Sequence, residues 1–385
     1  MKPIDPRALR ADYSFFLRDD RVLLTGHSHQ AWPDVARDAM TLAFDDAAAF
    51  VDDKWERAFE AADAVRSGIA ARIGARPDEI ALGSSTHELL TRFLSALDLK
   101  ARPHVLTTTG EFHAMHRQLA RLSEERLEVE AVPWAPVDTL AERLAARVRP
   151  TTAALMVSTV LFETASVVPH LSAAVSAAHR HGAAVLLDAY HGFAAMPMSV
   201  ADFGGEPVFV TAGGYKYAQW GEGNCFLRVP PGCALRPVYT GWFSDFANLS
   251  GAREGRAVGY GPRGADRFAG STYDPTSHYR ARAVIDWFDS LDLTLERCRA
   301  LSLAQTGRLM RGLEGLDVLT PRPEAARGAF VAVRSPHAST WVSLLRKEGI
   351  YTDARGDVLR LGPALYVTDD ELDRATDVLQ EIARR

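Results

Sequence analysis

Short apolar runs alternate with amphipathic stretches over residues 79–229, and this alternation limits the fold more than any other feature of the sequence. Most of the runs are apolar throughout, as expected for strands that helices cover on both faces. The stretches between them, at 86–97, 114–125, 137–148 and 171–180, have the spacing of amphipathic helices. The strand candidates are Glu79–Leu82, His104–Thr108, Val129–Val132, Ala153–Val160, Ala183–Asp188, Val208–Ala212 and Cys225–Val229. This order predicts an α/β fold with a mostly parallel sheet of about seven strands.

The composition changes after Pro230-Pro231-Gly232, where the strand–helix alternation ends. Residues 242–272 are rich in Gly, Arg and Asp and lack periodicity, which predicts a long ordered loop of the kind usually kept for function. Helical spacing returns at 275–291, 295–313, 338–348 and 368–383, with strand candidates at 329–333 and 358–361. We therefore expect a large domain over residues 34–274 and a smaller α+β domain formed by residues 1–33 and 275–385.

Charge and cysteine content narrow the class of protein. A net charge of −5 and a pI of about 6.2 give no general attraction to nucleic acid or to anionic membranes. We find no apolar run long enough to span a bilayer and no signal-peptide core at the N-terminus. The three cysteines, Cys225, Cys233 and Cys298, have neither metal-binding nor disulfide spacing. We expect a soluble cytoplasmic enzyme without a metal site, acting on a small molecule.

Two of the strand candidates end beside residues with complementary chemistry. Asp188 closes one apolar run, and Lys216, one of five lysines in the chain, follows the next run and the glycines Gly213 and Gly214. A lysine can hold an aldehyde as a Schiff base, and a carboxylate can keep a pyridine nitrogen protonated. The pair therefore predicts a site for pyridoxal 5'-phosphate (PLP). From these residues alone, an exposed loop lysine and a strand-end cap explain the pattern equally well.

Further residues are candidates for the same site, and most of them have a structural alternative. Ser85 and Thr86 open a predicted helix, whose backbone N–H groups can bind a phosphate or can simply be capped. Phe112 follows a strand and can stack on a pyridine ring or pack in the core. Tyr215 can bind phosphate or relay a proton, and His191 can lie near the Schiff base. Tyr215 can equally be a packing residue.

An arginine in the C-terminal tail and a polar stretch near the N-terminus are candidates for substrate contact. Arg360 lies among β-forming residues, which is typical either of a clamp on a substrate carboxylate or of a structural salt bridge. Residues 26–33 hold two histidines without an accompanying carboxylate or cysteine, which favours a substrate-lining loop over a metal site.

Together these motifs resemble the kynureninase branch of the class V aminotransferase superfamily, a group of fold-type I PLP-dependent enzymes. The order is Asp188-x-x-His191, then Gly214-Tyr215-Lys216-Tyr217, a Trp-bearing loop, and Leu-Arg-Leu-Gly-Pro-Ala-Leu-Tyr at 359–366. The resemblance covers nearly the whole chain and implies a seven-stranded, mostly parallel large domain with a smaller α+β domain. It also implies a homodimer with the cofactor at the subunit boundary.

The resemblance assigns roles to individual residues. Lys216 corresponds to the Schiff-base lysine, Tyr215 to a phosphate contact, Asp188 to the pyridine-binding carboxylate and Arg360 to the carboxylate-binding arginine. Other residues that correspond to the family's cofactor or substrate contacts are Ser28 near the substrate, Thr164 beside the cofactor, and Trp242 with Ser271 or Thr272, which reach the phosphate from the neighbouring subunit. Lys216 and Tyr215 are the residues we expect to move protons.

The departures from the family pattern concern the substrate. His27 stands where kynureninases have Asn, and His29-Gln30 replaces Leu-Gly. The Phe-Pro-x-Asp segment becomes 112–115 without its carboxylate, and residues 271–274 lack the Asn or Thr followed by Pro that seats the aromatic substrate. A cysteine desulfurase is disfavoured because no cysteine after Lys216 lies in a suitable loop.

These observations predict a kynureninase-like hydrolase that cleaves the Cβ–Cγ bond of L-kynurenine or a related amino acid, giving alanine and an aromatic acid. One alternative keeps the cofactor but changes the reaction to transamination, racemisation or C–S elimination on another amino acid. The other is a non-catalytic fold-type I binding protein.

Overall fold

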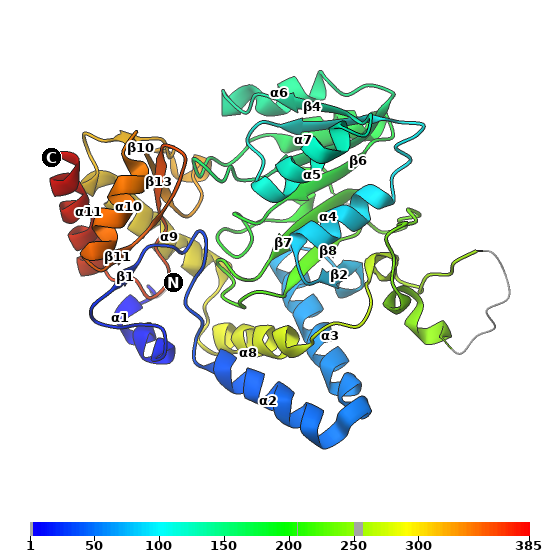
Figure 1. Cartoon of the computed structure of the whole chain (residues 1–385), viewed down its shortest axis with the longest axis horizontal. Helices are drawn as coiled ribbons and strands as arrows, with labels where there is room; N and C mark the ends of the chain where they lie inside the picture. Colours follow the sequence, from blue (N-terminus) through cyan, green and yellow to red (C-terminus); the bar gives the residue numbers. More distant parts are fainter. Residues whose placement is uncertain (1–2, 206, 250–256) are drawn as a thin grey trace.

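The computed structural model describes residues 3–205, 207–249 and 257–385. Its centre is a seven-stranded sheet in the order β2-β8-β7-β6-β5-β3-β4 (Figure 1). The strands are β2 (Ile80–Gly83), β3 (His104–Thr108), β4 (Glu128–Val132), β5 (Thr152–Ser158), β6 (Ala184–Asp188), β7 (Val208–Gly213) and β8 (Cys225–Arg228). Only β8 runs antiparallel to its neighbours, β2 and β7. The predicted α/β class with a mostly parallel seven-stranded sheet is therefore confirmed.

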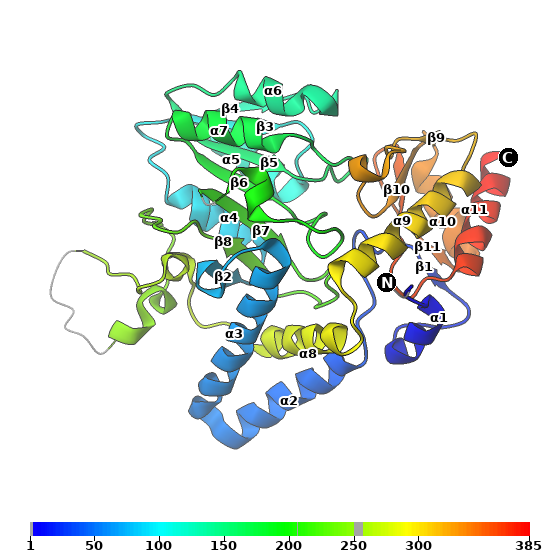
Figure 2. The same cartoon turned by 180° about the vertical axis from the view of Figure 1, so that it is seen from behind.

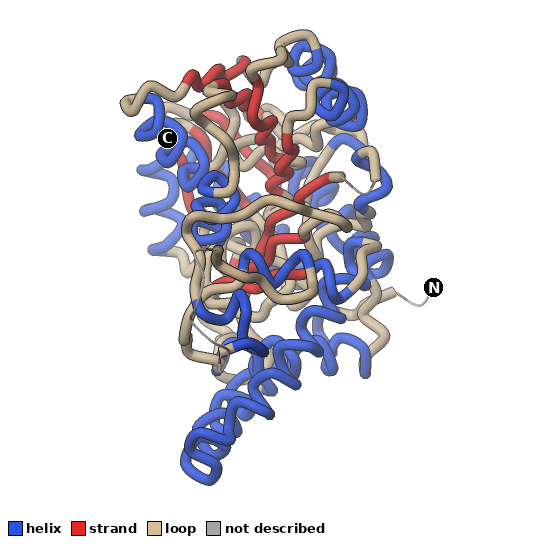
Figure 3. Tube along the Cα trace, turned by 90° about the vertical axis from the view of Figure 1, so that its right-hand side faces the viewer, coloured by secondary structure: helices blue, strands red, loops and turns tan. Residues whose placement is uncertain are grey.

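Helices cover both faces of this sheet, which explains why its strands are apolar throughout. The helices of this part are α2 (Val35–Phe50), α3 (Lys54–Ile73), α4 (Thr86–Ser95), α5 (His113–Ser123), α6 (Leu140–Ala145), α7 (Leu171–Arg180) and α8 (Thr276–Ser290). In strand β6, Leu186 packs in a core with α4 and α5, whereas Val185 and Leu187 pack in a second core with α6 and α7. Successive side chains thus enter opposite layers. Figure 3 shows the strands twisting through the middle of the molecule with helices around them.

The C-terminal part forms a second, smaller lobe beside the sheet (Figures 1 and 2). It contains α9 (Leu295–Gly312), α10 (Ala338–Lys347), α11 (Asp369–Ala383) and the antiparallel strands β9 (Asp317–Val318), β10 (Val331–Arg334), β12 (Asp353–Arg355) and β13 (Val358–Leu361). Helix α8 packs along α2 and α3, whereas the division expected from the sequence places it in the smaller domain. The division at residues 34 and 274 stays a prediction.

The N-terminal segment joins this lobe. It contains the short helix α1 (Pro6–Leu9) and strand β1 (Val22–Leu23), which pairs in parallel with β11 (Ile350–Tyr351). A bridge from Thr25 to Gly362 continues the pairing. Backbone hydrogen bonds join Gly26 to Gly362 and Gln30 to Tyr215, so residues 26–33 run beside the end of β13 and toward Lys216.

The stretch predicted as a long ordered loop contains two short 3-10 helices, η6 (Trp242–Asn248) and η7 (Gly264–Phe268). Residues 250–256 of this stretch lie outside the described residues. Among the residues that the structure describes, no helix has both the length and the apolar character needed to cross a membrane. The same residues include no group of three or more His, Cys, Asp or Glu side chains placed to hold a metal ion.

Candidate active site

Strands β6 and β7 bring Asp188 and Lys216 to the same edge of the sheet. The two strands are parallel and adjacent, and Asp188 lies opposite Thr211. Strand β7 ends at Gly213, three residues before the lysine. A Cβ atom at Gly213 would come within 2.3 Å of the Tyr190 hydroxyl oxygen, so this turn requires glycine. The register therefore places the carboxylate and the amine at neighbouring strand ends, where ligands bind in open α/β sheets.

The Lys216 side chain is buried among aromatic and imidazole rings. Its Nζ atom lies 2.7 Å from Nε2 of His191, and 4.8 Å and 5.3 Å from the ring centres of Tyr190 and Phe112. Burial lowers the pKa of Lys216, the Asp188 carboxylate opposes this effect, and the charge of Arg360 lowers the pKa further. Burial also lowers the pKa of His191 well below its ordinary value. Burial, with the charge of Arg360, therefore favours the uncharged, nucleophilic form of this amine.

The carboxylate side of the site contains a second buried acid. Burial raises the pKa of Asp188, while a 2.9 Å hydrogen bond from the backbone N–H of Tyr190 and the charge of Lys216 lower it. Glu111, which follows β3, accepts hydrogen bonds from the hydroxyls of Thr108 (2.5 Å) and Ser158 (2.6 Å). Burial raises the pKa of Glu111 to about 7, and the nearby charge of Asp188 adds to this rise.

The start of helix α4 has the properties expected of a phosphate cradle. Ser85 is the N-cap, and its hydroxyl accepts a 3.2 Å hydrogen bond from the backbone N–H of Glu88, as the capping alternative predicted. Thr86 is the first residue of the helix. The first N–H groups of any helix have no partner within it, and the helix dipole places partial positive charge there. Capping and anion binding are compatible at this turn.

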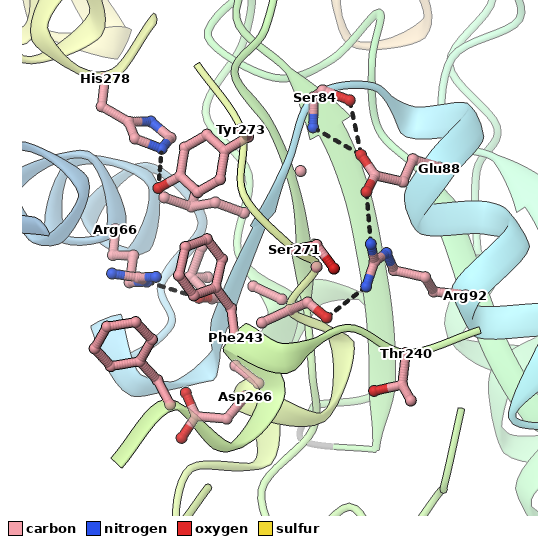
Figure 4. A pocket seen from close by; sticks show the side chains of 18 of the residues that line it. Arg66, Ser84, Glu88, Arg92, Thr240, Phe243, Asp266, Ser271, Tyr273 and His278 are labelled. Atoms are coloured by element: carbon pink, nitrogen blue, oxygen red, sulfur yellow. Dashed lines mark hydrogen bonds and ion pairs between the residues drawn. The ribbon is translucent and has the colours of Figure 1, made fainter. Parts of the chain in front are cut away.

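The segment with Ser271 and Thr272 lies beside this turn in the same chain. It lines a cavity of about 730 Å³ together with Ser84 and Glu88 (Figure 4). Glu88 accepts hydrogen bonds from the backbone N–H and the hydroxyl of Ser84, and it also pairs with Arg92. Arg92 in turn donates to the carbonyl of Ala269, which fixes the segment next to α4.

Trp242 and Thr164 lie in different surroundings. Trp242 is exposed and contacts the rings of Phe243 and Phe246, and no contact among the described residues joins it to Lys216. Thr164 is buried and donates a 2.8 Å hydrogen bond to the Ser166 hydroxyl. The roles of Trp242, Ser271 and Thr272 across a subunit boundary stay predictions, because a single chain does not contain that boundary.

The predicted substrate residues come from both ends of the chain. Ser28 lies 3.1 Å from the His29 ring nitrogen Nδ1, and the His29 ring stacks on Tyr215 at 5.0 Å between ring centres. Arg360, in β13, is buried and forms the salt bridge of the structural alternative, with its Nε and Nη2 atoms 2.9 Å and 2.6 Å from the oxygens of Asp353. Its role as a carboxylate clamp stays a prediction.

Three side chains of this region are absent from the predictions made from the sequence: Glu111, Asp353, and His27 as a partner of Asp353. His27 is fully buried, and its Nε2 atom lies 2.8 Å from Asp353 Oδ1. Burial lowers the pKa of His27 to about 4, so the ring is neutral near pH 7. A signal existed for Glu111, since an acid directly after a buried strand needs partners inside the protein.

The groups around Lys216 fit the needs of PLP. The cofactor needs an amine for its aldehyde, a carboxylate for its ring nitrogen, a ring to stack on and an anion site for its phosphate. Lys216, Asp188, Phe112 and the start of α4 offer these four groups around one end of the sheet. Phe112 is half-buried and already packs edge-on against Phe162, with 5.4 Å between ring centres.

Comparison with known proteins agrees with this chemistry. The Kynureninase C-terminal domain family matches residues 298–379. The kynureninase of Deinococcus radiodurans is 30% identical over 342 residues, covering 83% of this chain and 80% of the relative. An uncharacterized aminotransferase of Bacillus subtilis is 26% identical and covers 84% of both chains. The isopenicillin N epimerase of Streptomyces clavuligerus is 26% identical, covering 82% of this chain and 83% of the relative.

Solved structures show the same fold. A mutant of C-DES with glycine linked to its PLP cofactor has a TM-score of 0.84 at 19% identity, covering 96% of this chain and 98% of that one. The apo cysteine desulfurase of Thermococcus onnurineus has a TM-score of 0.81 at 17% identity, covering 100% of this chain and 99% of that one. The chain therefore belongs to the kynureninase branch of the class V aminotransferase superfamily and is a PLP-dependent enzyme of fold-type I.

Proposed function

We propose that the enzyme is a kynureninase-like hydrolase that cleaves the Cβ–Cγ bond of L-kynurenine or a related aryl-carbonyl amino acid. The observation that carries the proposal is the buried Lys216 amine, held by His191 and enclosed by aromatic rings, in a chain 30% identical to a kynureninase over most of its length. An aromatic enclosure suits a substrate with an aryl side chain.

Bound PLP supplies an electron-accepting ring that stores the charge left at Cα when its proton is removed. Asp188 would keep the ring nitrogen protonated, and Phe112 would supply an aromatic neighbour for the ring. Lys216 would hold the aldehyde of the cofactor and, as a free amine, would take the Cα proton of the substrate. The low pKa of Lys216 suits this role, because an amine must be uncharged to accept a proton.

In the remaining steps Tyr215 donates a proton and Arg360 binds the substrate α-carboxylate. Burial raises the pKa of Tyr215 to about 12, so its phenol stays protonated and can donate. Water adds its hydroxyl to the side-chain carbonyl carbon, the Cβ–Cγ bond breaks, and Cβ takes a proton. The atoms balance as L-kynurenine plus water giving anthranilate plus L-alanine.

We further propose a cytoplasmic homodimer in which Trp242 and Ser271 or Thr272 of one subunit contact the phosphate in the other. The exposed rings of Trp242 and Phe246 support a partner on this surface.

A second reaction of the same cofactor stands as the alternative. The isopenicillin N epimerase and the aminotransferase among the relatives, together with His27 in place of Asn, favour racemisation or transamination on another amino acid. C–S elimination is a further reaction of the same cofactor. A non-catalytic role is set aside, because the chain belongs to a family of PLP-dependent enzymes.

Incubation of the holoenzyme with L-kynurenine tests the proposal. We expect fluorescent anthranilate and L-alanine in equal amounts, and neither product from the Lys216→Ala variant. Accumulation of pyridoxamine phosphate or of a D-amino acid, without anthranilate, would instead establish one of the alternative reactions. The same mixtures, with L-alanine, L-phenylalanine and L-cysteine in place of L-kynurenine, identify which side chain the enzyme accepts.

A further inference from the structure

The guanidinium group of Arg360 is only partly occupied by its protein partners. An arginine has five N–H donors. In Arg360, Nε and Nη2 each donate to one oxygen of Asp353, and Nη1 donates to the carbonyl of Phe162 at 2.9 Å. One N–H on Nη1 and one on Nη2 remain. Two such N–H groups at the end of a guanidinium have the spacing that a carboxylate accepts in a bidentate pair.

Asp353 fixes the orientation of this guanidinium. Strands β12 and β13 are antiparallel, and Asp353 lies directly opposite Arg360, so both side chains are on one face of the hairpin. The two hydrogen bonds along one edge of the guanidinium leave it a single orientation. Arg355 adds a longer contact of 3.4 Å to the same carboxylate.

His27 in turn holds Asp353. The contacts with His27 and Arg360 keep the pKa of Asp353 well below its ordinary value, so this carboxylate is charged and can only accept. The neutral His27 ring must therefore donate through Nε2, which leaves Nδ1 as an acceptor. Nδ1 is buried and has no hydrogen-bond partner among the described residues. Such an arrangement costs stability, which is typical of a residue kept for its position rather than for folding.

This group lies next to the reacting amine. His27 and His191 both pack against Phe330, with 4.9 Å and 6.0 Å between ring centres, and His191 contacts Nζ of Lys216. The Arg360 guanidinium carbon lies 5.9 Å from the centre of the same Phe330 ring. Through Phe330 and His191, the Arg360 guanidinium therefore lies in the same buried region as Nζ of Lys216.

We propose that Asp353, braced by His27, is a positioning residue that holds Arg360 so that its two free N–H groups bind the substrate α-carboxylate. The inference rests on the proposed role of Arg360 as the carboxylate clamp. One guanidinium then serves two carboxylates, Asp353 along its edge and the substrate at its end. If the ion pair were only structural, its loss would change stability without distinguishing ligands that have a carboxylate from those that do not.

The test compares two ligands that differ only in that group. The holoenzyme is titrated with L-alanine, or with L-phenylalanine, and with the corresponding amide, and binding is followed through the absorption of the bound coenzyme. We expect Asp353→Asn to raise Kd for the amino acid by about tenfold or more, because a misplaced binding group loses affinity steeply. Kd for the amide should change less than twofold. Thermal unfolding of each variant reports whether it is folded.

His27 variants provide a second, milder perturbation. His27→Ala should raise Kd for the amino acid by a few fold, and His27→Gln, which restores an N–H donor toward Asp353, should recover most of the loss. The matched control is Asp357→Asn on the same hairpin, where Asp357 is exposed and contacts Arg334 at 3.7 Å. This control should leave both Kd values unchanged.

Equal effects of Asp353→Asn on the amino acid and its amide, or no effect on either, would overturn the inference. So would a wild-type enzyme that binds the amide as tightly as the amino acid. If Asp353→Asn does not fold, the two His27 variants decide the outcome. The quantity compared is again the change in Kd for the amino acid against the change in Kd for its amide. Since binding is measured without turnover, failure of L-kynurenine cleavage would refute the proposed function and leave this result standing.

Discussion

Glu111 couples folding of this protein to pH, and replacing it with glutamine should expose the coupling. Its ordinary pKa is 4.5, and burial, assisted by the charge of Asp188, raises it to about 7 although hydrogen bonds from Ser158 and Thr108 lower it. Between these two values the unfolded chain releases the proton before the folded one, so the folded state binds more protons and stability falls as the pH rises. Below 4.5 both states are protonated. Above pH 7 both states have released the proton, and the loss of stability caused by Glu111 is complete.

The size of the penalty follows from the two pKa values. At about 1.4 kcal/mol for each pH unit, the separation corresponds to about 3 kcal/mol. Glutamine carries no charge at any pH, and its amide oxygen can still accept from the Thr108 or Ser158 hydroxyl. For 385 residues the unfolding entropy is about 0.8 kcal/mol/K. At pH 5 the unfolded chain has already lost most of this proton, so about 2.5 kcal/mol of the penalty develops between pH 5 and pH 8. The Tm difference between Glu111→Gln and wild type should therefore increase by about 3 °C over this range in favour of the variant.

Thermal unfolding followed by circular dichroism at both pH values measures this difference. Protein and PLP concentrations are held fixed, because ligand and partner binding also shift Tm. Comparing differences between variants removes the contribution of other titrating groups. Glu381→Gln, at an exposed position of α11, is the control and should show the same difference from wild type at both pH values. If the Tm difference between Glu111→Gln and wild type is the same at both pH values, the reasoning that the ionised Glu111 carboxylate destabilises the folded state is refuted.

Lys216→Ala should abolish the visible absorption of the coenzyme attached to the protein, and borohydride should then no longer fix PLP to the chain; a retained band would remove Lys216 from the site. Gly213→Ala should lose coenzyme binding and at least about 2 kcal/mol of stability, because the added Cβ would lie 2.3 Å from the hydroxyl oxygen of Tyr190 and 2.5 Å from Sγ of Cys225. Gly192→Ala, whose Cβ would meet atoms at 3.4 Å and beyond, should change both quantities little.

Much of the architecture could be predicted because it depends on local patterns. All seven strand candidates of the large sheet are strands, since continuous apolar runs between helices have few other uses. The placement of Asp188 and Lys216 followed from the same rule, because neighbouring parallel strands end at one edge. These parts of the site needed only the order of elements along the chain.

The rest of the site depends on packing between distant segments. His27, Asp353 and Arg360 meet only because the N-terminal segment and the β12–β13 hairpin lie together. The sequence of neither segment predicts contact with the other. The sequence therefore left open whether Arg360 binds a substrate or a protein carboxylate. Trp242, Ser271 and Thr272 are harder still, since their predicted partners belong to a second chain.

The pairing of β1 with β11 has a consequence for synthesis on the ribosome. Val22 emerges early, but its partner Ile350 is translated roughly 330 residues later, a delay of about 15 to 65 s at ordinary elongation rates. All seven strands of the central sheet are complete in the meantime. The nascent chain must therefore carry an unpaired N-terminal segment for most of its translation, and the contact between His27 and Asp353 forms only after the last strands leave the exit tunnel.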